Sequence, residues 1–139
     1  MKLPSTTDIF VYGTLKPAEA NYKFYCQGKT LSEISAYTLG DLYALPIGYP
    51  AMTLGNNKVS GFVLSFDDSS ILDALDLLEG YQPQQALAFN EYYRLRVPVY
   101  CLEENAIAQA WAYFMTPKKV MQYQGIKVPS GYWTSRTRC

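Results

Sequence analysis

Residues 8–17 constrain the fold most, because they place a short hydrophobic stretch directly before a glycine. Ile9 to Tyr12 are four consecutive apolar or aromatic residues, a pattern typical of a strand that is buried on both faces. Gly13 then lets the backbone turn tightly or approach another group closely. We therefore expect exposed backbone N–H groups in this loop, where they would form a fixed dipole array for a carboxylate or a developing oxyanion. The alternative is a strand followed by a plain turn, and the Gly-Lys-Ser/Thr of a Walker loop is missing.

Most of the remaining chain has the pattern of β-strands. Runs rich in β-forming residues predict strands over 31–45, 59–66, 92–102 and 107–115. The first of these contains Gly40-Asp41, which predicts a bulge or bend, and the last two predict an antiparallel hairpin that turns at 103–105. Pro98 places its strand at an edge or at a bulge. Further turns are predicted at 45–51 and at Asn56-Asn57.

One helix is clearly marked. Asp67 to Ser70 are N-cap residues, and Ser70 and Asp73 have the spacing of an acidic capping box. Gly80 supplies a stop, so a helix is predicted from about Ser69 to Leu78. Two shorter elements complete the prediction: a loop or short helix within 18–26, and a helical turn over 118–123 after Thr116-Pro117.

Composition excludes several classes of protein. The chain has 139 residues, 49% of them apolar and 17% charged, which predicts a single folded domain over residues 1–139. Lys+Arg and Asp+Glu both number 12, so the net charge is zero and nucleic acid is not an expected partner. No signal-peptide core and no apolar run near the roughly 20 residues of a membrane span is present, which favours a cytoplasmic protein without membrane contact.

The residues available for chemistry are few. Histidine is absent, so acid–base chemistry must fall to a carboxylate, tyrosine, cysteine or lysine. The three cysteines are scattered and form no CxxC metal site, and Cys26 and Cys101 are interpreted as structural because a catalytic thiol lacks its usual histidine. Most of the 13 tyrosines are expected to pack in a sheet, and only one or two to reach a ligand.

Glu79 is the candidate proton carrier. At about 100° of rotation per residue it projects onto the same helix face as Leu72 and Leu75. Asp73 and Asp76 project away from the centre of that face and are expected to be solvated helix charges. Glu79 also lies in the last turn, where the helix dipole disfavours negative charge, and burial disfavours ionisation further. An upward-shifted pKa is therefore expected, which suits a general acid or base near neutral pH.

The alternative for Glu79 is an exposed side chain at a frayed helix end, or one paired with Arg94 or Arg96. Periodicity alone does not bring Glu79 to the loop at Gly13.

Several motifs together resemble the gamma-glutamylcyclotransferase family, including its gamma-glutamylamine cyclotransferase and avirulence-induced branches. The two longest pieces are Val11 to Pro17 and Leu72 to Tyr81. Shorter pieces follow in the same order: Gly40 to Tyr43, Tyr49 to Ala51, Val59 to Leu64, Tyr92 to Arg94 and Ala110 to Tyr113. The resemblance covers nearly the whole chain. It departs from the family at 18–20, where Ala-Glu-Ala stands and members often have a glycine, and this touches the rim of the site.

The resemblance implies an α+β fold, a small mixed β-barrel with flanking short helices and a cavity beside the first loop. It implies that Glu79 is the catalytic acid/base and Tyr113 a further substrate-binding candidate. The glutamyl group would be held, largely through backbone amides, by Tyr12, Gly13, Thr14 and Leu15.

The activity that the resemblance implies is the conversion of a γ-glutamyl amino acid or amine to 5-oxoproline and the free amine. This acyl transfer needs no cofactor and no metal, and the only expected partner is the small-molecule γ-glutamyl substrate. One alternative is a non-catalytic module that binds a small carboxylate or a peptide end on the same fold. Another is a structural partner protein, which predicts an occluded cavity and a large exposed apolar patch.

Overall fold

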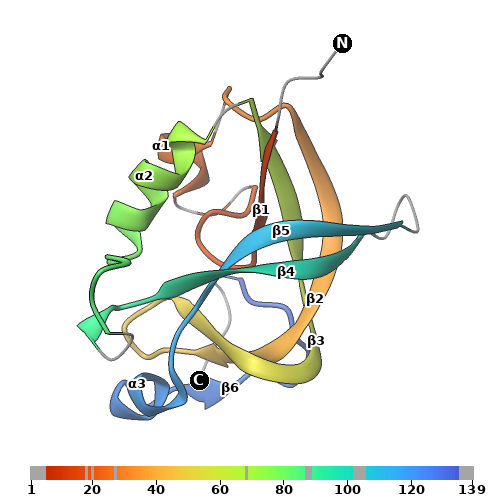
Figure 1. Cartoon of the computed structure of the whole chain (residues 1–139). Helices are drawn as coiled ribbons and strands as arrows, with labels where there is room; N and C mark the ends of the chain where they lie inside the picture. Colours follow the sequence, from red (N-terminus) through yellow and green to blue (C-terminus); the bar gives the residue numbers. More distant parts are fainter. Residues whose placement is uncertain are drawn as a thin grey trace.

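The computed structural model describes residues 6–17, 19, 21–26, 28–67, 69–86, 89–101 and 106–134. These residues form six strands and three short helices (Figure 1). The strands are β1 (Thr7–Val11), β2 (Ser32–Ala44), β3 (Pro50–Phe66), β4 (Tyr93–Cys101), β5 (Ala106–Phe114) and β6 (Ile126–Lys127). The helices are α1 (Tyr22–Tyr25), α2 (Ser70–Leu78) and α3 (Pro117–Gln122).

Five of the strands close into a barrel. The sheet order among the described residues is β3-β1-β5-β4-β2-β6, and an additional β3–β2 pairing joins the two sides. Most neighbours are antiparallel, but β1 runs parallel to β5, so the barrel is mixed. Helices α1 and α2 lie together beside the barrel, and α3 lies near β6 at its lower end in Figure 1. The predicted α+β fold, a small mixed β-barrel with flanking short helices, is confirmed.

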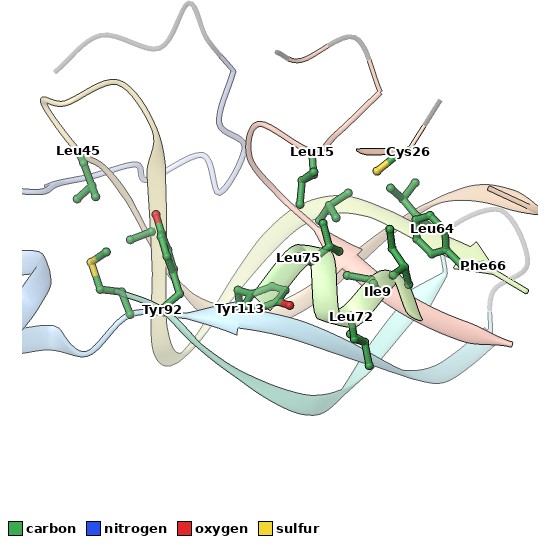
Figure 2. Close-up of a cluster of buried hydrophobic side chains, with 14 of the residues drawn as sticks. Ile9, Leu15, Cys26, Leu45, Leu64, Phe66, Leu72, Leu75, Tyr92 and Tyr113 are labelled. Carbon is green, nitrogen blue, oxygen red and sulfur yellow. The ribbon is translucent and has the colours of Figure 1, made fainter. Parts of the chain in front are cut away.

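β1 is buried on both faces, as its run of apolar residues predicts. Side chains alternate along a strand. Phe10 belongs to a cluster with Val59, Val63 and other strand residues, while Ile9 packs with residues of α2 in a second cluster. Figure 2 shows Leu72 and Leu75 of α2 close to Ile9. One face of β1 therefore packs against side chains from other strands of the barrel, and the opposite face packs against α2.

The long β2–β3 hairpin confirms one predicted irregularity and corrects another. Its register shifts between Gly40 and Asp41, where a bulge or bend was predicted. Gly40 pairs with Asn57 and Asp41 with Thr53, so residues 54–56 are extra residues within β3. The predicted turn at Asn56-Asn57 is therefore wrong, because the strand continues through both residues: Asn56 lies in the bulge and Asn57 pairs with Gly40.

α2 ends as predicted but begins differently. It starts at Ser70, and its N-cap residue Ser69 makes no side-chain capping hydrogen bond. The predicted capping box of Ser70 and Asp73 stays a prediction. At the other end Gly80 has φ 66°, a conformation that favours glycine. The amide of Tyr81 donates to the carbonyl of Asp76 at 2.9 Å, which completes a Schellman motif. This stop fixes Glu79 as the C-cap residue.

The other local predictions fall on described residues with one exception. The β4–β5 hairpin forms, α3 starts behind Thr116 as its N-cap, and β4 pairs with β2 only at Tyr100 and Cys101, which leaves Pro98 at an edge. The predicted turn at 103–105 lies outside the described residues. A single domain over residues 1–139 stays a prediction. In the described part of the chain, no helix has the length and apolar character needed to cross a bilayer.

Candidate active site

A cavity of about 280 Å³ lies where β1 ends. Its walls come from the loop after β1, the C-terminal end of α2, the turn before β3 and the start of β4, with one residue from β5. Both Gly13 and Glu79 line it. The loop that sequence analysis singled out and the acid at the end of α2 thus meet in one pocket, although some 65 residues separate them in the chain.

The loop presents backbone donors to this cavity. Gly13, Thr14 and Leu15 all line it, and none of their amides donates a hydrogen bond to another described residue. A side chain at Gly13 would meet Pro50, since an added Cβ would lie 2.7 Å from its Cγ. The side-chain amide of Asn21 donates to the Thr14 hydroxyl at 2.9 Å and so helps to hold the loop. The arrangement suits an anion, because unpaired amides are fixed partial positive charges.

Lys16 connects the same loop to a distant segment of the chain. Lys16 is only 1% exposed, and its ammonium donates to the carbonyl of Trp133. The same ammonium lies 3.6 Å from the centroid of the Tyr132 ring, a cation–π contact. The loop is therefore tied to the segment that follows β6.

Glu79 has the electrostatics of a proton carrier. Burial, and secondarily the charge of Glu91, raise its pKa from 4.5 to about 7. The upward shift expected from its place on the helix is thus present. Its carboxyl accepts no hydrogen bond from another described residue and does not pair with Arg94. A carboxyl with a pKa near 7 takes up and releases protons readily at neutral pH.

Four tyrosines line the cavity: Tyr12, Tyr49, Tyr92 and Tyr113. Burial raises the pKa of each, and the charge of Glu79 adds to the increase. The expectation that only one or two tyrosines reach a ligand stays a prediction, although four line the cavity. The four tyrosines come from different segments of the chain that meet at one end of the barrel. No local sequence pattern predicts this meeting.

Three of these hydroxyls are already engaged with the protein. Tyr12 donates to the carbonyl of Tyr113 at 2.7 Å and accepts from the amide of Met52 at 3.2 Å. Tyr92 donates to the carbonyl of Pro50 at 2.6 Å. These bonds tie the end of β1 to β3 and β5, so the tyrosines shape the cavity chiefly with their rings.

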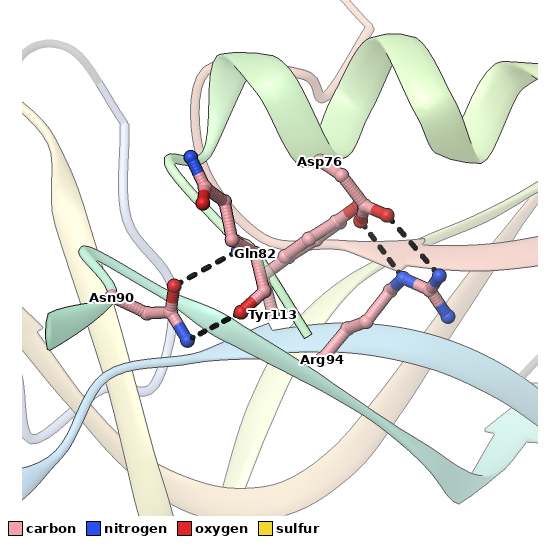
Figure 3. A network of polar contacts seen from close by, with 5 residues as sticks. All are labelled: Asp76, Gln82, Asn90, Arg94 and Tyr113. Atoms are coloured by element: carbon pink, nitrogen blue, oxygen red, sulfur yellow. Dashed lines mark hydrogen bonds and ion pairs between the residues drawn. The ribbon is translucent and has the colours of Figure 1, made fainter. Parts of the chain in front are cut away.

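Tyr113 is part of a polar network with α2 and β4. Its hydroxyl donates to Oδ1 of Asp76 at 2.6 Å. Arg94 donates to both oxygens of the same carboxylate, at 2.8 and 3.1 Å, as Figure 3 shows. The guanidinium also lies 4.5 Å from the ring of Trp111. The interpretation of Asp76 as a solvated helix charge is wrong, because its partners come from strands that the helix periodicity does not reveal.

The loop after α2 carries a second acid into the site. Asn90, only 2% exposed, exchanges two hydrogen bonds with the backbone of Gln82, and Figure 3 shows the pair. The amide of Glu91 donates to the carbonyl of Gly80 at 3.2 Å. The Glu91 side chain lines the cavity and accepts a hydrogen bond from the Tyr123 hydroxyl.

The structure brings together every sequence-predicted site residue: Tyr12, Gly13, Thr14, Leu15, Glu79 and Tyr113. Among the other lining residues, sequence analysis missed the four with polar side chains, namely Asn21, Tyr49, Glu91 and Tyr92. Tyr49 and Tyr92 stand within motifs that carry the family resemblance, which is the signal that points to them. Nothing local marks Asn21 or Glu91.

Metal and thiol chemistry receive no support from these residues. In the described ranges no group of three or more His, Cys, Asp or Glu side chains is arranged to hold a metal ion. Cys26 and Cys101 are buried, and burial raises the pKa of the Cys26 thiol to about 11. This fits the structural role expected for them.

A closed mixed barrel with an acidic, tyrosine-lined cavity at the end of its first strand defines a domain built around a small-molecule site. The family model described as "Gamma-glutamyl cyclotransferase, AIG2-like" matches residues 9–135. The chain therefore belongs to this gamma-glutamyl cyclotransferase, AIG2-like family.

Individual relatives agree with this assignment. A Drosophila melanogaster protein named "Putative gamma-glutamylcyclotransferase CG2811" is 29% identical in an alignment of 125 positions that covers 82% of this chain and 73% of that protein. YkqA from Bacillus subtilis has a TM-score of 0.65 and 25% identity; the match covers 93% of this chain but only 40% of YkqA. An AIG2-like protein from Mus musculus has a TM-score of 0.69 and 21% identity, with 95% and 90% of the two chains covered, and shows the shared fold.

Proposed function

We propose that this chain is a gamma-glutamylcyclotransferase that converts a γ-glutamyl amino acid or γ-glutamylamine to 5-oxoproline and the free amine. The observation that carries the proposal is the meeting of Glu79 with the unpaired amides of the Gly13 loop in one cavity. Family membership and the name of the Drosophila relative support the same activity. The cavity's size, about 280 Å³, suits a ligand as small as a γ-glutamyl compound.

The reaction is an intramolecular aminolysis. The α-amine attacks the γ-carbonyl carbon of its own glutamyl group, a C–N bond forms, and a five-membered ring closes. The bond to the leaving amine then breaks, and no water is consumed. Holding the chain folded contributes much of the acceleration, because well-oriented intramolecular reactions reach effective molarities of about 10⁵ to 10⁸ M.

Glu79 is the proton carrier in this proposal. As a carboxylate it takes the proton of the attacking ammonium, and as an acid it gives a proton to the departing nitrogen. A pKa of about 7 makes both steps accessible near neutral pH. The amides of Gly13, Thr14 and Leu15 hold the substrate carboxylate or the oxyanion that develops on the carbonyl. Tyr12 and Tyr113 contribute ring surface to the pocket, since both hydroxyls already donate within the protein.

The proposal is tested by incubating the purified protein with γ-glutamyl amino acids, γ-glutamylamines and glutathione and detecting 5-oxoproline directly. We expect release from at least one compound class, and Glu79→Gln to abolish it while the fold is kept. The amide preserves the shape of the side chain but carries no exchangeable proton of suitable pKa. Asp73→Asn, which removes an exposed carboxylate from the same helix, is the matched control and should retain activity.

Two outcomes would contradict the proposal. Release of 5-oxoproline by Glu79→Gln at the parent rate would remove Glu79 from the role. Tight binding of γ-glutamyl compounds by calorimetry, without turnover of any of them, would favour a binding module instead.

A further inference from the structure

The cavity contains a second acid that the proposed reaction does not use. Glu91 lies two residues before β4, and its backbone amide donates to the carbonyl of Gly80 at 3.2 Å. Its carboxylate accepts a hydrogen bond from Tyr123, which directly follows α3. The side chain is thus held from two elements of the fold.

The cavity is acidic. Among the described residues that line it, Glu79 and Glu91 are acidic and none is a lysine or an arginine. An acidic group on a ligand is accommodated by the loop amides, which have no hydrogen-bond partner among the described residues. A second acidic group near Glu91 would meet like charge and a desolvation cost. The cavity therefore favours ligands that carry positive charge beyond the γ-glutamyl group itself.

The surroundings of Glu91 are aromatic as well as acidic. Tyr49 and Tyr92 line the cavity with ring centroids 6.4 Å apart and planes tilted by 46°. The charge of Glu91 reaches both hydroxyls, because it contributes to raising the pKa of Tyr49 and of Tyr92. A carboxylate beside aromatic rings is suited to an ammonium group, which pairs with the former and is attracted to the faces of the latter.

We propose that Glu91, held by Tyr123, is a specificity-determining residue that selects a leaving amine carrying its own positive charge. This inference rests on the proposed function, in which Glu79 serves the attacking α-amine and leaves Glu91 to the departing half of the substrate. The substrate class is the γ-glutamyl derivative of a diamine, with one nitrogen in the scissile bond and the other as a free ammonium. Tyr123 is a positioning residue, since it acts through Glu91.

The test compares three γ-glutamyl amides that differ only in terminal charge. Their amines are 1,4-diaminobutane, pentylamine and 5-aminopentanoate, which end a four-methylene chain in an ammonium, a methyl group and a carboxylate. For the parent protein we expect kcat/KM to be about tenfold higher for the diamine derivative than for the pentylamine derivative, as one charge pair worth about 1.4 kcal/mol implies, and lowest for the carboxylate derivative.

Glu91→Gln should remove this preference, so that the diamine and pentylamine derivatives react within about twofold of each other. Tyr123→Phe keeps the carboxylate but loses its anchor, so the preference between the same two compounds should shrink. Asp73→Asn removes one exposed negative charge elsewhere and should keep the preference unchanged. Comparing substrates within each variant cancels any effect of the substitution on Glu79.

Equal rates for the three compounds in the parent, or a preference that persists in Glu91→Gln, would overturn the inference while leaving the proposed function standing. If no compound releases 5-oxoproline, the proposed function fails, and calorimetry with the three free amines decides the inference separately. Binding of 1,4-diaminobutane that exceeds that of pentylamine in the parent, but not in Glu91→Gln, would support the ammonium site. Equal binding would refute it.

Discussion

Replacing Glu79 by glutamine should stabilise the protein at alkaline pH while abolishing the proposed activity. The folded protein raises the pKa of this carboxyl from 4.5 to about 7, chiefly through burial. One pKa unit corresponds to about 1.4 kcal/mol, so keeping Glu79 ionised in the folded protein costs about 3.5 kcal/mol. Glutamine has no ionised form and avoids this cost.

The sign follows from proton binding. Between pH 4.5 and about 7 the folded protein retains the Glu79 proton that the unfolded chain has released. The contribution of Glu79 to the free energy of unfolding is therefore highest below pH 4.5, falls as pH rises through this window, and is constant above it. The difference in the free energy of unfolding between Glu79→Gln and the parent should therefore increase as pH rises.

Urea unfolding at about pH 4.5 and at about pH 8, followed by tryptophan fluorescence, measures this gap. We expect Glu79→Gln to gain about 2 to 3 kcal/mol over the parent between the two conditions. Asp73→Asn reports the effect of losing one exposed carboxylate from the same helix. An identical gap at both pH values would refute the conclusion that the fold desolvates the Glu79 carboxyl.

Three further predictions concern groups around this carboxyl. Asp76→Asn should lower the free energy of unfolding by about 2 kcal/mol in urea titrations, because the partly buried guanidinium of Arg94 loses its charged partner; a change below about 0.5 kcal/mol would contradict this. Glu91→Gln should lower the pKa of Glu79, so the rise of 5-oxoproline release with pH should move to lower pH; an unmoved profile would count against the charge of Glu91. Gly80→Ala should cost about 1 to 2 kcal/mol by thermal unfolding, since φ is 66° and the new Cβ would lie 2.9 Å from Glu91 Cβ.

Sequence patterns predicted the structure correctly where it depends only on residues that are neighbours in the chain. The apolar run before Gly13 predicted a strand buried on both faces, and Gly80 predicted the end of α2, because both features depend on neighbouring residues alone. Asn56-Asn57 failed as a turn signal because β3 continues through both residues while it pairs with β2, with Asn56 in a bulge and Asn57 opposite Gly40. Tertiary pairing outweighed local turn preference there.

The site was less accessible to local reasoning. Helix periodicity placed Glu79 on the apolar face, yet only the family resemblance linked it to the Gly13 loop. The same periodicity misjudged Asp76, because a polar side chain outside the apolar stripe still reaches partners when strands such as β4 and β5 lie beside the helix. No sequence pattern pointed to Glu91, because its hydrogen-bond partner Tyr123 lies 32 residues away in the chain.

The contact of Lys16 with the carbonyl of Trp133 sets an order of events during biosynthesis. A ribosome delivers the loop after β1 early and its support near residue 133 more than a hundred residues later. Until that last segment leaves the exit tunnel, Lys16 has neither this carbonyl nor the ring of Tyr132 beneath it. The contacts that hold Lys16 therefore form only after every strand of the barrel has been synthesised.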